Sequence, residues 1–240
     1  MPNPTAAMLV IGDEILSGRT RDANMHHLAG ELTAVGVDLR EVRVVSDDRP
    51  AIIAAVRALS DGHDHVFTSG GIGPTHDDIT ADCIAAAFER PIDVRDDARA
   101  LLQAHYDASG KELNAARLRM ARIPDGAMLI DNPVSVAPGF TLGNVHVMAG
   151  VPSVFQAMVA SILPAMTGGA PLQSRTLPLM QGEGDVAARL TAFAEQHSDL
   201  SVGSYPFQKD GQYGTNLVLR GSDIAQLDSA LLALKKVFSA

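Results

Sequence analysis

The sequence has only one cysteine, Cys83, among its 240 residues. A single thiol can form neither an intrachain disulfide nor a thiolate metal cluster, so both are excluded. Cys83 lies in a segment whose apolar residues, including Ile79, Ile84, Ala87 and Phe88, recur at helical spacing. We therefore expect a thiol packed in the core rather than a reactive one.

The sequence is also poor in basic residues and in long apolar runs. Its 19 Lys and Arg face 28 Asp and Glu, which gives a formal charge of −9, so broad attraction to nucleic acid or to an anionic membrane is not expected. Any bound phosphate must then be held by local groups. No apolar run is long enough to span a bilayer, and the N-terminus has no basic segment followed by an apolar core. We expect a cytoplasmic protein without nucleic-acid or membrane partners.

Strand and helix patterns alternate along the first part of the chain. The patterns predict strands at residues 6–11, 37–46 and 65–69, and helices at 22–35 and 48–60. Alternation at this spacing indicates a parallel sheet with right-handed crossovers. Ligands of such sheets bind beyond the carboxyl ends of the strands. The residues that follow each strand are therefore the candidates for a site.

The rest of the chain is expected to continue this α/β domain and to add a smaller one. We predict a helical segment at 96–122, a turn at 123–126, short strands at 128–130 and 145–149 separated by a rigid loop at 132–140, and a helix at 153–166. Residues 168–172 have the composition of a linker. The remainder reads as a β-α-β-β-α unit with a hairpin near residues 209–211. The expected domains are residues 4–168 and 173–240.

A glycine-rich loop follows the third predicted strand. Gly70, Gly71 and Gly73 lack a Cβ, so the backbone there can adopt positive φ and approach a ligand closely. The free amides of the helix that follows would donate to a phosphate. Asp77 and Asp78 would repel that phosphate unless a divalent cation lay between them. The loop therefore predicts a site for phosphate and metal.

Two features of this region allow simpler interpretations. Thr75 and Asp78 have the spacing of a capping box, in which each caps the other's backbone amide at a helix start. Arg117, Arg119 and Arg122 are either phosphate ligands or a solvated helix face. The sequence leaves both alternatives open.

Four motifs in order resemble the molybdopterin-binding (MoCF-type) domain family, as found in the N-terminal region of competence/damage-inducible protein A and in eukaryotic FAD synthases. The motifs are Gly12-Asp-Glu-Ile-Leu-Ser-Gly18 with Asp22 and Asn24, Gly70-Gly-Ile-Gly-Pro-Thr-His-Asp-Asp-Ile-Thr80, Asn132-Pro with Ala137-Pro-Gly-Phe140, and Gly150-Val-Pro152. The resemblance implies a three-layer α/β/α fold with a mostly parallel sheet, followed by a small α+β domain. It does not extend to the C-terminal amidase domain of full-length relatives, so we expect no amidase activity.

The resemblance also implies roles for individual residues. It gives Asp77 and Asp78 catalytic and metal-binding roles, with Mg²⁺, Mn²⁺ or Co²⁺ as the cation. The ligand would be a small phosphorylated molecule, either a nucleotide diphosphate such as ADP-ribose or FAD, which is hydrolysed, or molybdopterin, which is only bound. The residues implied to bind or border this ligand are Asp13, Glu14, Asn24, Gly70, Gly71, Gly73, Pro74, Thr75, Asn132, Pro138 and Gly139.

The chain departs from the family pattern in two places. Ser135-Val136 stands where relatives usually have Gly-Thr, which removes a hydroxyl and a glycine beside the ligand, and Ala149 replaces a proline. These changes keep binding without turnover as the alternative to pyrophosphatase activity. Members of the family commonly form dimers or trimers, so a homo-oligomer is expected.

Overall fold

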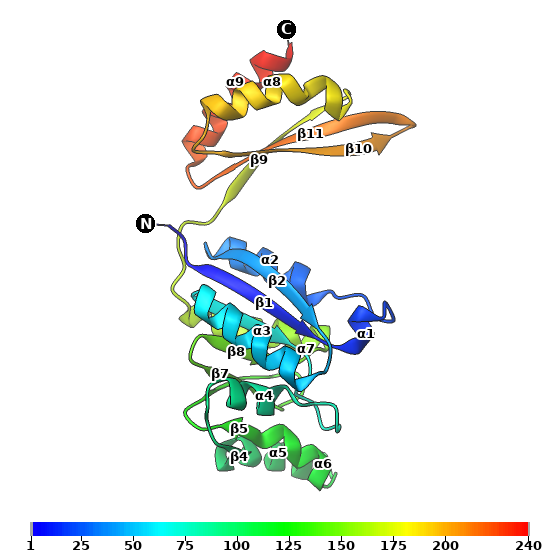
Figure 1. The fold of residues 1–240 in the computed structure, drawn as a ribbon, viewed down its shortest axis with the longest axis vertical. Coiled ribbons are helices and arrows are strands. Elements are labelled where there is room, and N and C mark those ends of the chain that lie inside the picture. The colour runs from blue at the N-terminus through cyan, green and yellow to red at the C-terminus, as the bar shows by residue number, and fades with distance from the viewer. Residues whose placement is uncertain (1, 240) are drawn as a thin grey trace. The chain divides into compact units, whose positions relative to one another are not determined.

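The computed structural model describes residues 2–239. The chain divides into two compact units, Met1–Gly169 and Ala170–Ala240, and this boundary falls inside the predicted linker. Among the described residues no helix combines the length and the hydrophobicity needed to cross a membrane. Each unit has its own core and is described separately (Figure 1).

The first unit is built on a six-stranded sheet in the order β2-β1-β3-β8-β7-β6. Its strands are β1 (Thr5–Ile11), β2 (Asp38–Val45), β3 (His65–Ser69), β6 (Met128–Ile130), β7 (Gly139–Leu142) and β8 (Val145–Met148). The pairs β2–β1, β1–β3 and β3–β8 are parallel, whereas β8–β7 and β7–β6 are antiparallel. The expected mostly parallel α/β sheet is confirmed. Four parallel strands therefore end at one edge of the sheet.

Helices cover both faces of this sheet and make the unit three-layered (Figure 1). One face packs against α3 (Arg49–Gly62), α4 (Thr80–Ala87) and α5 (Asp96–Ala108), and the other against α2 (Asn24–Ala34) and α7 (Pro152–Ile162). Because both faces are buried, β1 is apolar at nearly every position. Cys83 is fully buried in α4, and burial raises the pKa of its thiol to about 11, which confirms the packed core thiol.

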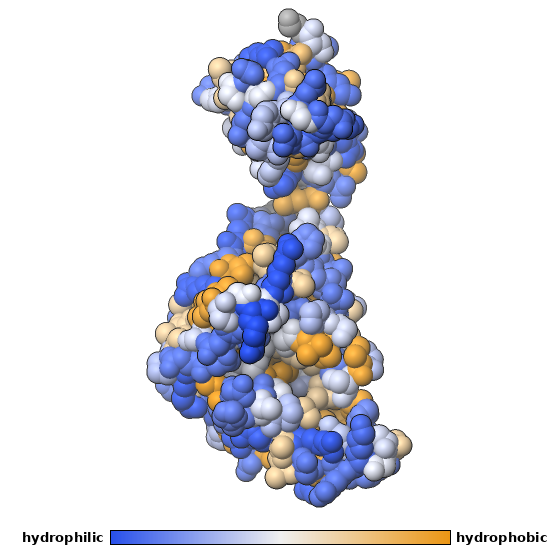
Figure 2. All heavy atoms as spheres, turned by 90° about the vertical axis from the view of Figure 1, so that its right-hand side faces the viewer, coloured by the Kyte–Doolittle hydropathy of each residue, from blue (hydrophilic) through white to orange (hydrophobic). Residues whose placement is uncertain are grey.

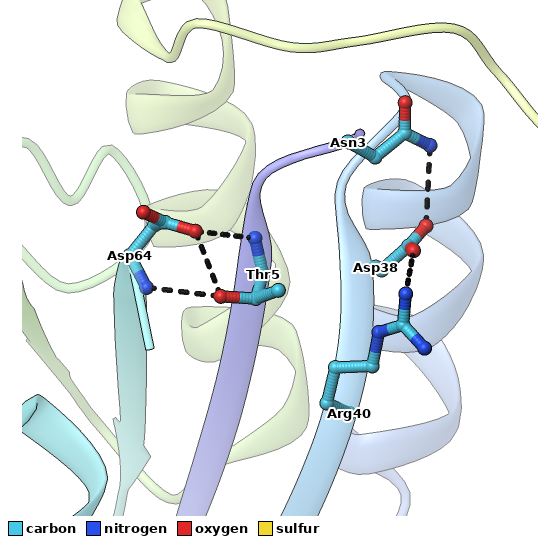
Figure 3. A network of polar contacts seen from close by, with 5 residues as sticks. All are labelled: Asn3, Thr5, Asp38, Arg40 and Asp64. Carbon is cyan, nitrogen blue, oxygen red and sulfur yellow. Dashed lines mark hydrogen bonds and ion pairs between the residues drawn. The ribbon is translucent and has the colours of Figure 1, made fainter. Parts of the chain in front are cut away.

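A polar network joins the amino ends of three strands, at the edge opposite to the glycine loop (Figure 3). The Asp64 carboxylate accepts hydrogen bonds from the Thr5 amide (2.8 Å) and hydroxyl (2.7 Å). Asp38 accepts from Asn3 (3.1 Å) and pairs with Arg40 (2.6 Å). The bonds from Thr5 lower the pKa of Asp64. The network fixes the start of β1 relative to β2 and β3, and so helps to set where these strands end.

The second unit is a three-stranded antiparallel sheet with two helices on one face. Its strands are β9 (Gln173–Leu179), β10 (Ser201–Lys209) and β11 (Gln212–Gly221), in the order β10-β11-β9. The helices α8 (Glu183–Gln196) and α9 (Ile224–Ser239) bury side chains such as Phe193 and Leu234 against Leu217 and Leu219. The expected β-α-β-β-α order is confirmed.

Several predicted elements between the glycine loop and β8 were wrong in extent. The segment 96–122 is not one helix, because α5 ends at Ala108 and is followed by a loop, the short helices α6 (Ala115–Leu118) and η1 (Arg119–Ala121), and β5 (Arg122–Pro124). β5 pairs with β4 (Ile92–Val94), which was missed. The predicted loop 132–140 ends early, since β7 begins at Gly139. These pieces are too short to show a period of their own, and pairing with distant strands decides them.

Candidate functional site

The carboxyl ends of the parallel strands converge around Gly70. The amide of Gly12, after β1, donates to Val45 O at the end of β2 (3.1 Å), and the amide of Gly70 donates to Met148 O at the end of β8 (3.2 Å). A Cβ on Gly70 would lie 2.2 Å from Ile11 O, and φ there is +109°. Only glycine fits at this crossing of chains. The chain thus turns away from β3 immediately after Ser69.

The glycine loop is held by Thr80, the first residue of α4. The Thr80 hydroxyl donates to Gly70 O (2.9 Å), and its amide donates to Gly71 O (3.0 Å). Among the described residues, the amides of Gly71, Ile72 and Gly73 have no protein acceptor. Consecutive free amides in a turn form a concave anion site. The amides of Ala81 and Asp82 in the first turn of α4 likewise have no protein acceptor among the described residues, so free donors lie both in the loop and at the start of the following helix.

The two aspartates of the loop differ in their surroundings. Asp78 Oδ2 accepts from the Thr75 amide (2.8 Å) and hydroxyl (2.5 Å), which is half of the predicted capping box. No helix starts there, however, because α4 begins only at Thr80. Asp77 is exposed, and the nearby Thr75 hydroxyl together with its own backbone amide lowers its pKa. Asp77 is therefore an ionised, accessible carboxylate, whereas one oxygen of Asp78 is used to shape the loop.

Sequence reasoning missed one acidic residue, Asp47, which follows β2. Its carboxylate accepts from the Asp13 amide (3.0 Å). Burial raises the pKa of Asp47, and the negative charges of Asp13, Glu14 and Asp77 raise it further. Three carboxylates from two other strand ends thus lie close enough to act on Asp47. The rule that places ligands beyond strand ends, applied to residues 46–48, would have found Asp47.

These carboxylates do not form a ready-made metal centre. No group of three or more His, Cys, Asp or Glu side chains within the described part of the chain is arranged to hold a metal ion. The carboxylates instead suit a hard cation that takes one or two protein oxygens and completes its shell with phosphate and water. Burial is the main cause of the raised pKa of Asp47, and the neighbouring carboxylates, which raise it further, favour a neutralising charge.

Two clefts flank the glycine loop. The first encloses about 340 Å³, part of it open to solvent, and is lined by Gly71, Gly73, Asp78, Arg119, Arg122 and Pro138 among others. The second is an open cleft of about 360 Å³, a volume that includes open solvent, and is lined by residues that include Glu14, Ile15, Asn24, Ser69, Gly150 and Pro152. The short helix α1 (Asp13–Leu16) borders the second cleft and lies on the right-hand side of the first unit in Figure 1. Figure 2 views the molecule from that side, where the surface is mostly hydrophilic with separate hydrophobic patches.

Two arginines of the predicted cluster, Arg119 and Arg122, line the first cleft, and the third, Arg117, does not. Arg119 lines the first cleft and donates to Asp78 O (3.3 Å), while its buried Nε has no partner. Arg122 lines the same cleft and pairs with Asp82 (2.5 Å). Arg117 instead stacks over Tyr106 at 4.6 Å and donates to a backbone carbonyl. Arg119 thus brings a guanidinium beside the glycine loop and Arg122 brings one already paired with Asp82, which sequence spacing alone could not decide.

The remaining predicted site residues have largely structural contacts. The Asn132 side chain is buried and bonds only to its own loop, accepting from the amides of Val134 (3.1 Å) and Ser135 (3.2 Å) and donating to Ser135 Oγ (2.7 Å) and Ala137 O (2.8 Å). Gly139 lies inside β7, where a Cβ would sit 2.4 Å from Val147 O. Pro74 is exposed on the glycine loop.

Comparison with known proteins identifies the two units separately. Residues 7–168 match the family described as "Probable molybdopterin binding domain", and residues 171–240 match "FAD synthase, middle domain". A probable FAD synthase of Caenorhabditis elegans is 31% identical over 98% of this chain and 50% of its own length. A CinA-like protein of Geobacter metallireducens is 33% identical over 82% of this chain and 50% of its own length. The chain thus spans about half of each.

A solved structure supports the fold of the first unit. It is that of the protein CinA, of unknown function, from Thermoplasma acidophilum, which is 34% identical with a TM-score of 0.62. The similarity covers 68% of this chain and 97% of that one.

Proposed function

The chain belongs to the family of probable molybdopterin-binding domains, and from this membership we propose that it binds a nucleotide diphosphate and hydrolyses it with the help of a divalent cation. The observation that carries the proposal is the glycine loop, with three free amides at the point where the strands end. Arg119 and Arg122 line the cleft beside the loop together with Asp78, and Asp13, Glu14 and Asp77 lie near Asp47.

The cation would be held by the carboxylates nearest the loop, among them Asp77, whose side chain is exposed. Asp13, Glu14 and Asp47 would supply further oxygens, directly or through water. A bound divalent cation neutralises phosphate charge and makes its bound water more acidic. The protein's own part is to hold the diphosphate on the loop amides, so that the charge developing on phosphate oxygens meets donors already in place.

The proposed substrate class follows from the relatives and from chemistry. One relative is named a probable FAD synthase, and FAD contains a diphosphate between two organic groups. ADP-ribose has the same linkage. The second candidate function is binding of molybdopterin without turnover, which the family's description favours and with which the altered loop at Ser135 and Val136 is compatible.

Product release from ADP-ribose and FAD tests the proposal. The purified protein would be assayed with Mg²⁺, Mn²⁺ or Co²⁺ and with chelator, beside a titration with molybdopterin. We expect cleavage that requires the cation and stops with chelator. Saturable binding of molybdopterin without cleavage of either diphosphate would support the second function and contradict the first.

A further inference from the structure

Two buried side chains in the second cleft have unused hydrogen-bonding groups. Asn24, at the start of α2, is only 3% exposed, and its Nδ2 donates to Ser69 Oγ (2.8 Å) and to Gly150 O (2.8 Å). Its Oδ1 has no partner. Ser69 Oγ accepts from Asn24, but its own hydrogen has no acceptor among the described residues. A buried acceptor left unpaired costs about 1–3 kcal/mol.

Asn24 and Ser69 both line this cleft, and their two unused groups together match a ligand atom that donates and accepts. Asn24 Oδ1 needs a donor and the Ser69 hydroxyl needs an acceptor, and both residues line the cleft. A hydroxyl group supplies both functions at once. Neither a phosphate, which only accepts, nor an apolar group, which does neither, would satisfy the pair. The cleft therefore suits a ligand that carries hydroxyls.

The other residues that line the cleft are also suited to binding a sugar. Glu14 lies in its wall and can accept from a second hydroxyl, in the way that carboxylates bind ribose. Val10, Ile15 and Pro152 supply an apolar surface for the ring. Ser69 is followed directly by Gly70, where the diphosphate loop begins. In a nucleotide diphosphate, ribose is joined to the diphosphate by one ester linkage, so the two subsites are adjacent in the order that this ligand needs.

We propose that the cleft between the 20–24 segment and the end of β3 is a ribose subsite, with Asn24 and Ser69 as the residues that select for a hydroxyl. The inference rests on the proposed function, because the loop must hold the diphosphate. It also goes beyond it, since it names the part of the nucleotide that this cleft holds and the residues that hold it. Asn24 and Ser69 then determine specificity and need not touch the reacting phosphorus.

The test measures binding without hydrolysis, by calorimetry in the presence of Mg²⁺. The probes are α,β-methylene-ADP, its 2′-deoxy and 3′-deoxy analogues, and methylenediphosphonate, which has no sugar. We expect Ser69→Ala to weaken α,β-methylene-ADP about tenfold, the factor for a lost hydrogen bond of about 1.4 kcal/mol, and to leave methylenediphosphonate unchanged. One of the two deoxy analogues should bind the wild type about tenfold less tightly than α,β-methylene-ADP does. The same analogue should bind Ser69→Ala and wild type with equal affinity, because the hydroxyl that Ser69 contacts is already missing.

Matched variants keep the result interpretable. Thr68→Val removes a neighbouring hydroxyl that is also buried and unpartnered but lies outside the cleft lining, and it should leave all affinities unchanged. Asn24→Ala should reproduce Ser69→Ala, with its melting temperature measured in parallel. Equal effects of Ser69→Ala on both diphosphates, or no effect on either, would overturn the ribose subsite and leave the diphosphate loop standing. Failure of wild type to bind methylenediphosphonate would overturn the proposed function itself.

Discussion

The carboxylate of Asp78 turns back onto Thr75 and accepts from both its amide (2.8 Å) and its hydroxyl (2.5 Å). The neighbouring Asp77 lies near the same hydroxyl but keeps an exposed side chain, 63% accessible. The same turn thus gives the adjacent carboxylates of Asp77 and Asp78 different hydrogen bonds and different exposure. One shapes the glycine loop, and the other faces solvent on the side where a cation would bind.

Substitution by asparagine should separate these two aspartates. Asp77→Asn should lower cation-dependent turnover about tenfold or more, the factor for 1.4 kcal/mol of lost charge interaction, at an unchanged melting temperature. Asp78→Asn should also cost about 1 kcal/mol of stability, as the loss of a cap does. Turnover and thermal melts measure both, with exposed Asp61→Asn as control. Equal melting temperatures for the two variants would contradict the structural part of Asp78.

Gly71→Ala should destabilise the protein more than Gly126→Ala. Both glycines have positive φ, +70° and +82°, but a Cβ on Gly71 would lie 2.1 Å from Thr80 Oγ1, whereas nothing lies within 4 Å of one on Gly126. Both variants lose about 1 kcal/mol from backbone strain, and only Gly71→Ala must also displace the hydroxyl that holds the loop. Urea denaturation compares them. Similar losses would show that the loop accommodates a side chain.

Val136→Gly should stabilise the protein. Val136 has φ +65°, which is strained for a β-branched residue, and its amide closes the loop onto Asn132 O (2.9 Å). Relief of a left-handed conformation is worth about 1–2 kcal/mol, and the greater freedom of glycine in the unfolded chain offsets part of this. A net gain of up to about 1 kcal/mol is expected in urea denaturation. A loss would mean that the valine side chain contributes more through packing than it costs in strain.

His146 should make stability depend on pH below neutrality. It lies in β8, hydrogen-bonded to Thr141 (2.9 Å) and to His65 (3.3 Å). Burial, and to a lesser degree the charge of His65, lowers its pKa from 6.5 to about 4. The folded state therefore prefers neutral His146. This stabilisation is complete above pH 6.5 and is lost as the pH falls toward 4, by at most about 3 kcal/mol.

The His146→Phe variant provides the comparison for this pH dependence. A phenyl ring keeps the contact with Phe67, whose ring centre lies 4.9 Å from that of His146, and it cannot titrate. Denaturation measured between pH 7 and pH 4 should give a flatter profile for the variant than for the wild type. Parallel profiles would assign the pH dependence to other groups.

The sequence predicted secondary structure correctly in segments whose own hydrophobic pattern shows which side chains are buried. β1 is apolar at almost every position because both faces of the sheet are covered, and α3 shows its buried stripe at Ile52, Val56 and Leu59. The glycine loop was also predictable, since its positive φ angles restrict the residues that can occupy it. Hydrophobic periodicity and positive φ angles depend on residues close together in the sequence, so the sequence alone can reveal them.

The sequence alone determined the fold class, the order of elements up to the glycine loop and in the second unit, and the loop around which the site is built. Only the tertiary structure decided which side chains meet there. Asp47 accepts from the Asp13 amide beside the other carboxylates, and the Asn132 side chain bonds to its own loop. Contacts between strand ends depend on strand register and chain crossing, which no local sequence pattern encodes. The unpaired Oδ1 of Asn24 likewise arises from a contact with Ser69, 45 residues away.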